Sequence, residues 1–337
     1  MNDHDSPLLE LEHLSTSFFT DKGEIRAVDD VSFSIKAGET LALVGESGCG
    51  KSVTAFSIMR LVDKPGKVVG GKIVFKGQNL LELSDPAMRK IRGKSIGMIF
   101  QEPMTSLNPV FRIGDQIGET LEIHTDLSRS AIRQEVLRLL ERVRIPSPDK
   151  RIDQYPHELS GGMKQRVMIA MALACKPDLL IADEPTTALD VTIQAQILDL
   201  LKNLQEEMGM AILLITHNLG VVAQFSRQVI VMYASKIAER ASVEQLFRNP
   251  SHPYTKALLN SLPRPNERAK RLESIQGTVP SPLDYPRGCH FSTRCSEILD
   301  VCAEQPPPLV HVESGHETSC WLYAGHPLKA TGSNEEQ

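Results

Sequence analysis

The 337-residue sequence lacks several features that define whole classes of protein. Its longest apolar run, residues 167–175, is far shorter than the ~20 residues that span a bilayer. It opens on a polar, acidic stretch, residues 1–7, without the apolar region of a signal peptide. We therefore expect a soluble, cytoplasmic chain, and any passage across a membrane is expected to belong to another polypeptide.

Basic residues are not concentrated anywhere in the chain. Lys and Arg total 37 against 42 Asp and Glu, which gives a formal net charge of −5 and an isoelectric point near 6.1. A nucleic-acid partner normally leaves a basic footprint, so this charge argues against one. Paired C-x-x-C knuckles are also absent, and with them the strong zinc signature.

A glycine-rich phosphate loop is the first motif that is present. Residues 45–52 fit G-x-x-x-x-G-K-[ST], and they stand between an apolar run at 41–44 and a helix-compatible stretch at 52–56. This is the strand–loop–helix setting that the motif requires. Backbone N–H groups would wrap the β-phosphate, Lys51 would bridge the β- and γ-oxygens, and the Ser52 hydroxyl would ligate Mg²⁺. The residues expected to bind ATP here are Gly45, Ser47, Gly48, Gly50, Lys51 and Ser52.

A second anion-binding turn lies far downstream. Ser160, Gly161 and Gly162 open the apolar run at 167–175, which we expect to be a buried helix. Only the first of the two turns carries the phosphate-loop lysine. Two unrelated glycine-rich loops are the simpler explanation, but the pair favours a nucleotide shared between two copies of the fold.

Two adjacent carboxylates follow a buried strand at 179–182. Asp183 stands at the carboxyl end of that strand and would hold the Mg²⁺ shell, while Glu184 would orient and activate the attacking water. Alone, such a pair would be explained by a surface turn. A phosphate loop on the same chain favours the catalytic interpretation.

Together these motifs resemble the ATP-binding subunit of an ABC transporter, whose signature is Leu-Ser-Gly-Gly, here residues 159–162. The resemblance implies an α/β P-loop NTPase with a RecA-like core, an antiparallel β subdomain and an inserted helical subdomain. It also implies that Ser160, Gly161 and Gly162 bind the γ-phosphate of ATP held by a partner chain, and that hydrolysis separates the partners.

The resemblance gives roles to further residues. Gln101 follows the strand-like run 96–100 and matches the glutamine that touches Mg²⁺ or the attacking water. His217 matches the switch histidine that contacts the γ-phosphate, although a lone strand-end histidine is more often structural. Asp190 matches the loop that communicates between the paired sites. Phe18 matches the aromatic residue that stacks on adenine, with Phe19 as its rival.

The chain divides by composition. We expect an ATPase domain over 1–245, with its helical subdomain at about 102–165, then an irregular extension rich in proline and cysteine over 246–325, and a disordered tail at 326–337. Within the insertion, a helix with one apolar face is expected over 132–143. The buried parallel strands expected in the core are 179–182 and 211–215, and a further strand is expected at 229–233.

Three stretches narrow the branch of the family. Residues 101–109, 183–192 and 249–259 are similar to segments of the ATPases of dipeptide and oligopeptide importers, the dipeptide-importer subunit above all. This implies that the chain energises peptide uptake at the cytoplasmic face of the inner membrane, as a peripheral protein. The implied partners are two permease subunits, a homologous ATPase in a heterodimer, and an extracytoplasmic peptide-binding protein, with the permease docking near Gln101.

Other functions stay open. Related importers carry nickel, opines or glutathione, and no residue here reads the cargo. An ATPase acting on nucleic acid is a second class, but the stretch between Lys51 and Ser160 is too short for a long coiled-coil arm and the acidic balance disfavours it. A third class is a subunit that binds ATP but cannot hydrolyse it. The presence of a suitable residue at every expected catalytic position argues against this class.

Four of the six cysteines lie in the extension. Cys289, Cys295, Cys302 and Cys320 are separated by five, six and seventeen residues. A reducing compartment disfavours disulfides, and spacing alone leaves both metal-binding thiolates and unligated thiols open. The resemblance to peptide importers implies that the four hold a [4Fe–4S] centre that staples a tail with little apolar core. The other two, Cys49 and Cys175, are not expected to be ligands.

Overall fold

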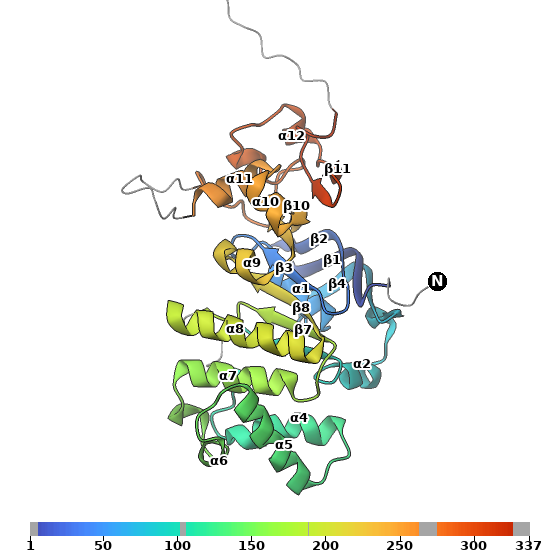
Figure 1. Ribbon diagram of the computed structural model, residues 1–337. Helices are drawn as coiled ribbons and strands as arrows, with labels where there is room; N and C mark the ends of the chain where they lie inside the picture. The colour runs from blue at the N-terminus through green and yellow to red at the C-terminus, as the bar shows by residue number, and fades with distance from the viewer. Residues whose placement is uncertain (1–5, 102–105, 188, 263–274, 326–337) are drawn as a thin grey trace, which may run out of the picture.

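The computed structural model describes residues 6–101, 106–187, 189–262 and 275–325. Two sheets and their covering helices form the centre of the molecule, with a helical region at one end and the C-terminal segment at the other (Figure 1). Among the described residues, no helix is both long enough and apolar enough to cross a membrane.

The smaller sheet is antiparallel and has four strands in the order β2-β1-β4-β5. Its strands are β1 (Leu9–Thr20), β2 (Gly23–Ile35), β4 (Gly66–Phe75) and β5 (Gln78–Asn79). In β2, the buried residues Val31, Phe33 and Ile35 alternate with the more exposed Ser32 and Ser34. One face of this sheet therefore packs on the core, as an alternating pattern requires.

The larger sheet has eight strands in the order β11-β12-β10-β9-β3-β8-β7-β6. Its parallel strands are β3 (Thr40–Val44), β6 (Ile96–Ile99), β7 (Leu179–Asp183), β8 (Ala211–Thr216) and β9 (Gln228–Tyr233). The expected strands at 179–182, 211–215 and 229–233 are confirmed. Every residue of β3, β6, β7 and β8 is buried, which is why they read as continuous apolar runs.

The register of the parallel strands aligns their carboxyl ends. Val44 lies beside Thr216, and Asp183 lies beside Ile215. Ile99, the last residue of β6, pairs with Ala182. The segments that follow β3, β6, β7 and β8 therefore leave the sheet at one edge, which is where open α/β sheets bind ligands.

The helices of this region lie on both sides of the large sheet, some packed against it and others in an outer layer. They are α1 (Lys51–Ile58), α2 (Asp85–Ile91), α4 (Ile113–His124), α5 (Arg129–Arg142), α6 (Pro148–Arg151), α7 (Gly161–Leu173), α8 (Val191–Met208) and α9 (Leu219–Phe225), with 3₁₀ turns η1 (Leu80–Glu82) and η2 (Pro156–Glu158). One apolar cluster joins the sheet to α7, α8 and the α4–α5 pair, and another joins it to α1 and the small sheet. Each large side chain that is fully buried there contributes roughly 1.5–3 kcal/mol.

The helical predictions agree with the structure. In α5, Val136, Leu139 and Leu140 are buried, which confirms the apolar face expected over 132–143. Helix α7 follows the Ser160 turn, and most of its side chains are buried. Figure 1 shows α4, α5 and α6 on the far side of α7 from the sheet.

The C-terminal segment extends the large sheet. Its elements are β10 (Lys236–Ser242), α10 (Val243–Arg248), α11 (Pro253–Asn260), η3 (Ser292–Arg294), α12 (Val301–Glu304), β11 (Val310–Glu313) and β12 (His316–Thr318). Strand β12 pairs antiparallel with β10, and β11 pairs with β12. The prediction of an irregular extension is therefore wrong for the helix at 253–260 and for the strands at 310–313 and 316–318. The tail at 326–337 lies outside the described residues.

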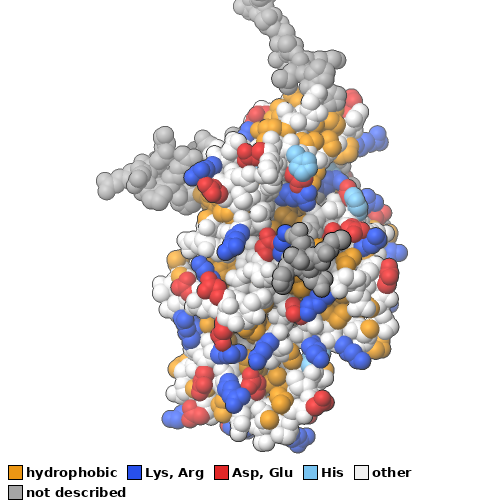
Figure 2. All heavy atoms as spheres, turned by 45° about the vertical axis from the view of Figure 1, so that its right-hand side comes forward, with side chains coloured by type: hydrophobic (Ala, Val, Ile, Leu, Met, Phe, Trp, Pro, Cys, Tyr) orange, Lys and Arg blue, Asp and Glu red, His pale blue; other side chains and the backbone are white. Residues whose placement is uncertain are grey.

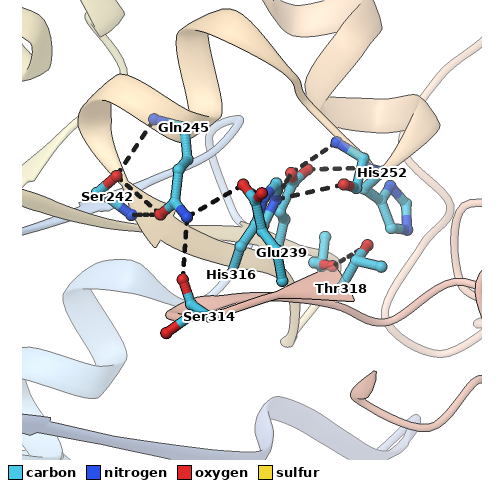
Figure 3. Close-up of polar contacts among 10 residues, drawn as sticks. Glu239, Ser242, Gln245, His252, Ser314, His316 and Thr318 are labelled. Atoms are coloured by element: carbon cyan, nitrogen blue, oxygen red, sulfur yellow. Dashed lines mark hydrogen bonds and ion pairs between the residues drawn. The ribbon is translucent and has the colours of Figure 1, made fainter. Parts of the chain in front are cut away.

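A buried polar cluster fixes β12 to β10. His316 Nε2 lies 2.7 Å from Glu239 Oε1, and both side chains are fully buried. The same carboxylate accepts the backbone N–H groups of Ser251 at 2.7 Å and His252 at 2.9 Å (Figure 3). Burial lowers the pKa of His252 to about 4, so that ring stays neutral. The Glu239 carboxyl group is thus hydrogen-bonded both to the loop before α11 and to β12.

The surface mixes charges of both signs. On the face shown in Figure 2, Lys and Arg side chains are interspersed with Asp and Glu. Exposed charges of opposite sign form ion pairs on the surface, such as Arg133 with Asp153 at 2.8 Å. This face presents no block of one sign, in keeping with the near balance of the sequence.

Candidate functional site

The phosphate loop, residues 45–52, leaves β3 and enters α1 in a conformation that requires glycine at two positions. Gly45 has φ +152, and a Cβ there would stand 2.2 Å from the carbonyl oxygen of Met232. Gly50 has φ +105 and caps α1, and its Cβ would stand 2.2 Å from Ala27 O. Larger residues would collide with neighbouring backbone, so the motif's glycines at these positions are set by packing.

Lys51 is buried and points back over the loop. Its Nζ donates to Gly45 O at 2.9 Å and to Glu46 O at 3.0 Å. The ammonium group therefore lies inside the curve of the loop, where the phosphates of a nucleotide would come. Ser47 and Gly48, at the tip of the loop, are exposed.

Asp183 and Ser52 lie within hydrogen-bonding distance of each other. Asp183 is 1% exposed, and its Oδ1 is a buried atom without a hydrogen-bond partner. Burial raises the pKa of Asp183, although a hydrogen bond with Ser52 opposes the shift. An unpartnered buried carboxylate oxygen beside a serine hydroxyl is the donor set that Mg²⁺ uses in phosphate-loop proteins. The predicted metal ligands Ser52 and Asp183 therefore fit a Mg²⁺ ion.

The Glu184 carboxylate is contacted by side chains from the segments that follow three parallel strands. Its Oε2 accepts hydrogen bonds from Thr187 Oγ1 at 2.7 Å and Gln101 Nε2 at 3.1 Å. Its Oε1 lies 3.0 Å from His217 Nδ1. The structure thus brings together the three predicted catalytic residues, Gln101, Glu184 and His217, from the segments after β6, β7 and β8.

The surroundings of Glu184 keep it ionised. Burial would raise the pKa of Glu184, but hydrogen bonds from His217 and Thr187 outweigh it and the net shift is downward. A carboxylate that is ionised near neutral pH can accept a hydrogen bond from water. Sequence reasoning missed Thr187, which lies three residues after Glu184. The spacing could have revealed it, because a hydroxyl three residues after Glu184 can fold back and donate to that carboxylate.

The second glycine-rich turn stands at the start of α7. Ser160 caps that helix by accepting the N–H of Met163 at 3.4 Å, and both Ser160 and Gly161 are exposed. Asp190 caps α8 in the same way, through Ile193 N at 2.9 Å. Gly162 packs near α8, because a Cβ there would meet Ile193 at 3.0 Å. These exposed N-termini are free to meet a ligand from outside the chain.

The two candidate adenine-binding rings lie on neighbouring positions of β1. Phe18 is half-buried, and a Cβ on Gly66 would collide with its ring at 2.6 Å. Phe19 is exposed, with Lys67 Nζ 4.8 Å from its ring centroid. The assignment of Phe18 to adenine stays a prediction.

The four cysteines of the extension share one neighbourhood but do not form a compact site. All are free thiols, and burial, with the other thiols adding to it, raises the pKa of Cys289 to about 11 and of Cys320 to about 12. Cys295 shows an upward pKa shift of the same origin, and the backbone N–H of Cys289 donates to Cys302 O at 2.8 Å. Among the described residues, no three His, Cys, Asp or Glu side chains are grouped to hold a metal ion. The predicted [4Fe–4S] centre therefore has no support from this arrangement.

Parts of two predicted segments lie outside the described residues. Of the stretch 101–109, expected near the permease, residues 102–105 are not described. In the stretch 183–192, the same holds for residue 188.

Two family profiles match the chain. The family described as "ABC transporter" matches residues 28–187, which contain the phosphate loop, the Ser160 turn and the Asp183–Glu184 pair. The family described as "Oligopeptide/dipeptide transporter, C-terminal region" matches residues 238–302. The second match begins in β10 and continues into the extension.

Whole proteins are similar over nearly the full length. "Probable peptide ABC transporter ATP-binding protein y4tR" of Sinorhizobium fredii is 54% identical over 93% of this chain and 94% of its own length. "Dipeptide transport ATP-binding protein DppD" of Bacillus subtilis is 52% identical over 94% of each chain, and the Escherichia coli protein of that name is 48% identical over 93% and 96%.

A solved structure with the same core binds nucleotide. The ATP-binding cassette MJ0796, in a dimeric post-hydrolysis state bound to ADP and phosphate, is 29% identical with a TM-score of 0.64. It covers 70% of this chain and 98% of its own length.

Proposed function

Since this chain belongs to the ATP-binding subunits of the ABC transporter family, we propose that it hydrolyses ATP to drive the uptake of dipeptides and oligopeptides. The observation that carries the proposal is the set of hydrogen bonds at Glu184. Gln101, Thr187 and His217 all reach this one carboxylate, at the same edge of the sheet as the phosphate loop. The match of residues 238–302 to the peptide-transporter C-terminal region supports the cargo.

The residues of this chain divide the work of hydrolysis among them. Lys51 and the loop N–H groups bind the phosphates, and the Glu184 carboxylate orients the attacking water and accepts its hydrogen bond. His217 and Gln101 hold that carboxylate and face the γ-phosphate side. Ser52 and Asp183 would bind Mg²⁺, which neutralises charge on the phosphates. Catalysis is then positioning and charge stabilisation, without covalent chemistry.

A partner chain completes the site in this proposal. The exposed turn at Ser160, Gly161 and Gly162 has no nucleotide to bind within its own chain, and would bind the γ-phosphate held by the partner. Asp190 would lie at the same interface. Loss of the bridging phosphate charge on hydrolysis would then release the two chains. The dimeric state of MJ0796 with ADP and phosphate supports the pairing of two such chains.

Glu184→Gln is the test of the catalytic assignment. The variant, assembled with its partners, should bind ATP and dimerise, while steady-state hydrolysis falls by about a hundredfold or more because the carboxylate no longer assists the water. Glu206→Gln, on an exposed position of α8, is the matched control and should hydrolyse normally. Normal turnover by Glu184→Gln would refute the assignment.

The wider system is proposed from the same family. Its members would be two permease subunits, a second ATPase in a heterodimer and an extracytoplasmic peptide-binding protein, with this chain peripheral at the cytoplasmic face of the inner membrane. The domain division of 1–245 and 246–325 is kept as a proposal, supported by the two profile matches at 28–187 and 238–302.

Cargo is tested in a deletion strain. Loss of this chain should abolish growth on di- and tripeptides as sole nitrogen source, and the wild-type chain, but not Glu184→Gln, should restore it. If the deletion strain instead loses uptake of nickel or glutathione and still grows on peptides, the cargo is that other solute and not a peptide.

The iron–sulfur prediction stays a prediction. What favours it is the donor set, because Cys289, Cys295, Cys302 and Cys320 are four free thiols in one region of a peptide-transporter extension. Brown colour with iron and acid-labile sulfide after anaerobic purification would support it. A colourless or zinc-loaded protein would leave four thiols without a cluster.

A further inference from the structure

The C-terminal segment reaches into the phosphate loop through one arginine. Arg294, on the 3₁₀ turn η3, donates from Nη1 to Glu46 Oε2 at 2.6 Å and from Nη2 to Glu46 Oε1 at 3.2 Å. Glu46 is the second residue of the loop. Although 248 positions separate the two residues, this is a bidentate, charge-assisted contact, the strongest type that an arginine makes with a carboxylate.

Arg294 is held so that its guanidinium group cannot turn away. Its side chain is only 4% exposed, and it also donates from Nε to Gln276 O at 3.1 Å and from Nη1 to Tyr233 Oη at 3.3 Å. Burial alone would lower the pKa of Arg294, but hydrogen bonds to Glu46 and Tyr233 raise it overall. The charge is therefore fixed against the loop.

A tyrosine of the same segment holds the backbone of the same residue. The N–H of Glu46 donates to Tyr254 Oη at 3.0 Å, and the Tyr254 side chain is fully buried. Its ring packs on Tyr233, with centroids 4.7 Å apart, and on Phe291 at 5.4 Å. The hydroxyl is thus positioned by an aromatic cluster that joins β9, α11 and the start of η3.

All the polar groups of Glu46 are then engaged. Its carboxylate meets Arg294, its N–H meets Tyr254, and its carbonyl oxygen accepts from Lys51 Nζ at 3.0 Å. The last contact makes Glu46 the direct neighbour of the cation that binds phosphate. Movement of Glu46 would therefore move both the loop and Lys51.

We propose that Tyr254 and Arg294 are positioning residues for ATP, which hold the phosphate loop in its binding shape through Glu46. The C-terminal segment thereby belongs to the nucleotide site as well as to the sheet. This inference rests on the proposed ATP hydrolysis at that site. Pre-forming the loop removes an ordering cost that ATP would otherwise have to offset on binding.

Kinetics of the full chain, assembled with its partners, test the proposal. The loop contacts ATP in the ground state and the transition state alike, so Arg294→Gln should raise KM for ATP about tenfold or more with kcat nearly unchanged. Arg294→Lys keeps the charge but not the bidentate contact, and should recover part of the loss. A merely destabilised protein would instead lose active molecules, which lowers apparent kcat and leaves KM alone.

Two further variants isolate the contact. Tyr254→Phe keeps the ring and removes only the acceptor, so it should weaken binding of a fluorescent ATP analogue about two- to tenfold even if Arg294→Gln does not fold. Adding Glu46→Gln to Arg294→Gln should cost little more than either change alone, because the two residues form one pair. Lys256→Gln removes an exposed ion pair with Glu297 in the same segment and should leave KM unchanged.

The outcomes separate this inference from the function on which it rests. If the wild-type chain hydrolyses ATP while Arg294→Gln and Tyr254→Phe bind ATP as tightly as it does, the positioning role is refuted and the ATPase stands. If the wild-type assembly does not hydrolyse ATP, the proposed function itself fails.

Discussion

A single carboxylate, Glu184, collects most of the polar contacts of the site. Its two oxygens meet Thr187, Gln101 and His217 at 2.7, 3.1 and 3.0 Å. The residue itself has φ +46, the left-handed region that non-glycine residues rarely adopt. This backbone conformation costs free energy and persists only where the surrounding structure holds it. Residues in such conformations are concentrated at functional sites.

Thr187→Val tests what these contacts do. The Thr187 hydroxyl helps to lower the pKa of Glu184, and the carboxylate is the active form. Valine is nearly isosteric but cannot donate, so the pKa of Glu184 should rise and the acid limb of the kcat profile should move to higher pH. Because the carboxylate stays ionised near neutral pH, kcat there should change little, and the loss should appear at acid pH as the raised pKa is approached. An unmoved acid limb would contradict this role.

Asp183→Asn tests how much the buried Asp183 carboxylate destabilises the folded chain. Burial raises the pKa of Asp183, so the native state holds its proton at higher pH than the unfolded chain does, and this group's contribution to stability falls as pH rises through that window. Without Mg²⁺ or nucleotide, the variant should therefore be more stable at pH 7, by about 0.5–2 kcal/mol, while losing Mg²⁺-dependent hydrolysis. Thermal unfolding at pH 7 and at pH 3.5 provides the check, since the gain should shrink at the lower pH.

At the scale of elements, two serine-capped helices offer a comparison. Ser160 caps α7 and Ser128 caps α5, each by accepting a backbone N–H at 3.4 Å. Both serines are exposed. Because both serines have the same capping role, any difference between the effects of replacing them must come from a contact outside the helix that each one caps.

Ser160→Ala and Ser128→Ala should therefore separate capping from nucleotide binding. Each loses about 0.5–2 kcal/mol of stability from the lost cap. Only Ser160→Ala should also lose ATP-dependent dimerisation, because its turn would bind the γ-phosphate of the partner's ATP. Light scattering with and without ATP in the Glu184→Gln background measures this. Equal dimerisation of both variants would remove Ser160 from the composite site.

The parallel strands and the strand-end residues could be predicted because their signals are local. An apolar run such as 179–182 by itself predicts a buried strand, and a polar residue directly after it lies at the carboxyl end of that strand. Strands β11 and β12 carried no such signal, since they are short and follow a proline-rich stretch. The Arg294–Glu46 contact joins residues 248 positions apart, which no local pattern reports.

On the scale of the whole molecule, the buried Glu239–His316 pair fixes the last strand of the C-terminal segment to the large sheet. It links β10 to β12 inside a region where neither side chain reaches solvent (Figure 3). Gln245, which caps α10, adds a hydrogen bond to Ser314 O at 3.0 Å just before β12. The C-terminal segment is therefore integrated by polar contacts as well as by strand pairing.

His316→Ala should loosen that segment. It leaves the buried Glu239 carboxylate without its ring partner, and breaking such a pair costs about 3–5 kcal/mol. The exposed pair of Glu244 with Arg248 is the control, since Glu244→Ala should cost about 1 kcal/mol or less. Adding Glu239→Gln to His316→Ala should recover part of the loss. Equal unfolding temperatures for the two single variants would contradict the importance of the buried pair.

The pairing of β12 with β10 has a consequence for shortened forms of the chain. Cut after residue 245, the polypeptide would present β10 as a bare sheet margin, with unpaired N–H and C=O groups and an uncovered Glu239. Such a margin recruits strands from other molecules, so the shortened form should self-associate into insoluble material. In the intact chain the outermost strands of the large sheet, β11 and β6, have only four residues each, which leaves little template for that process at this sheet.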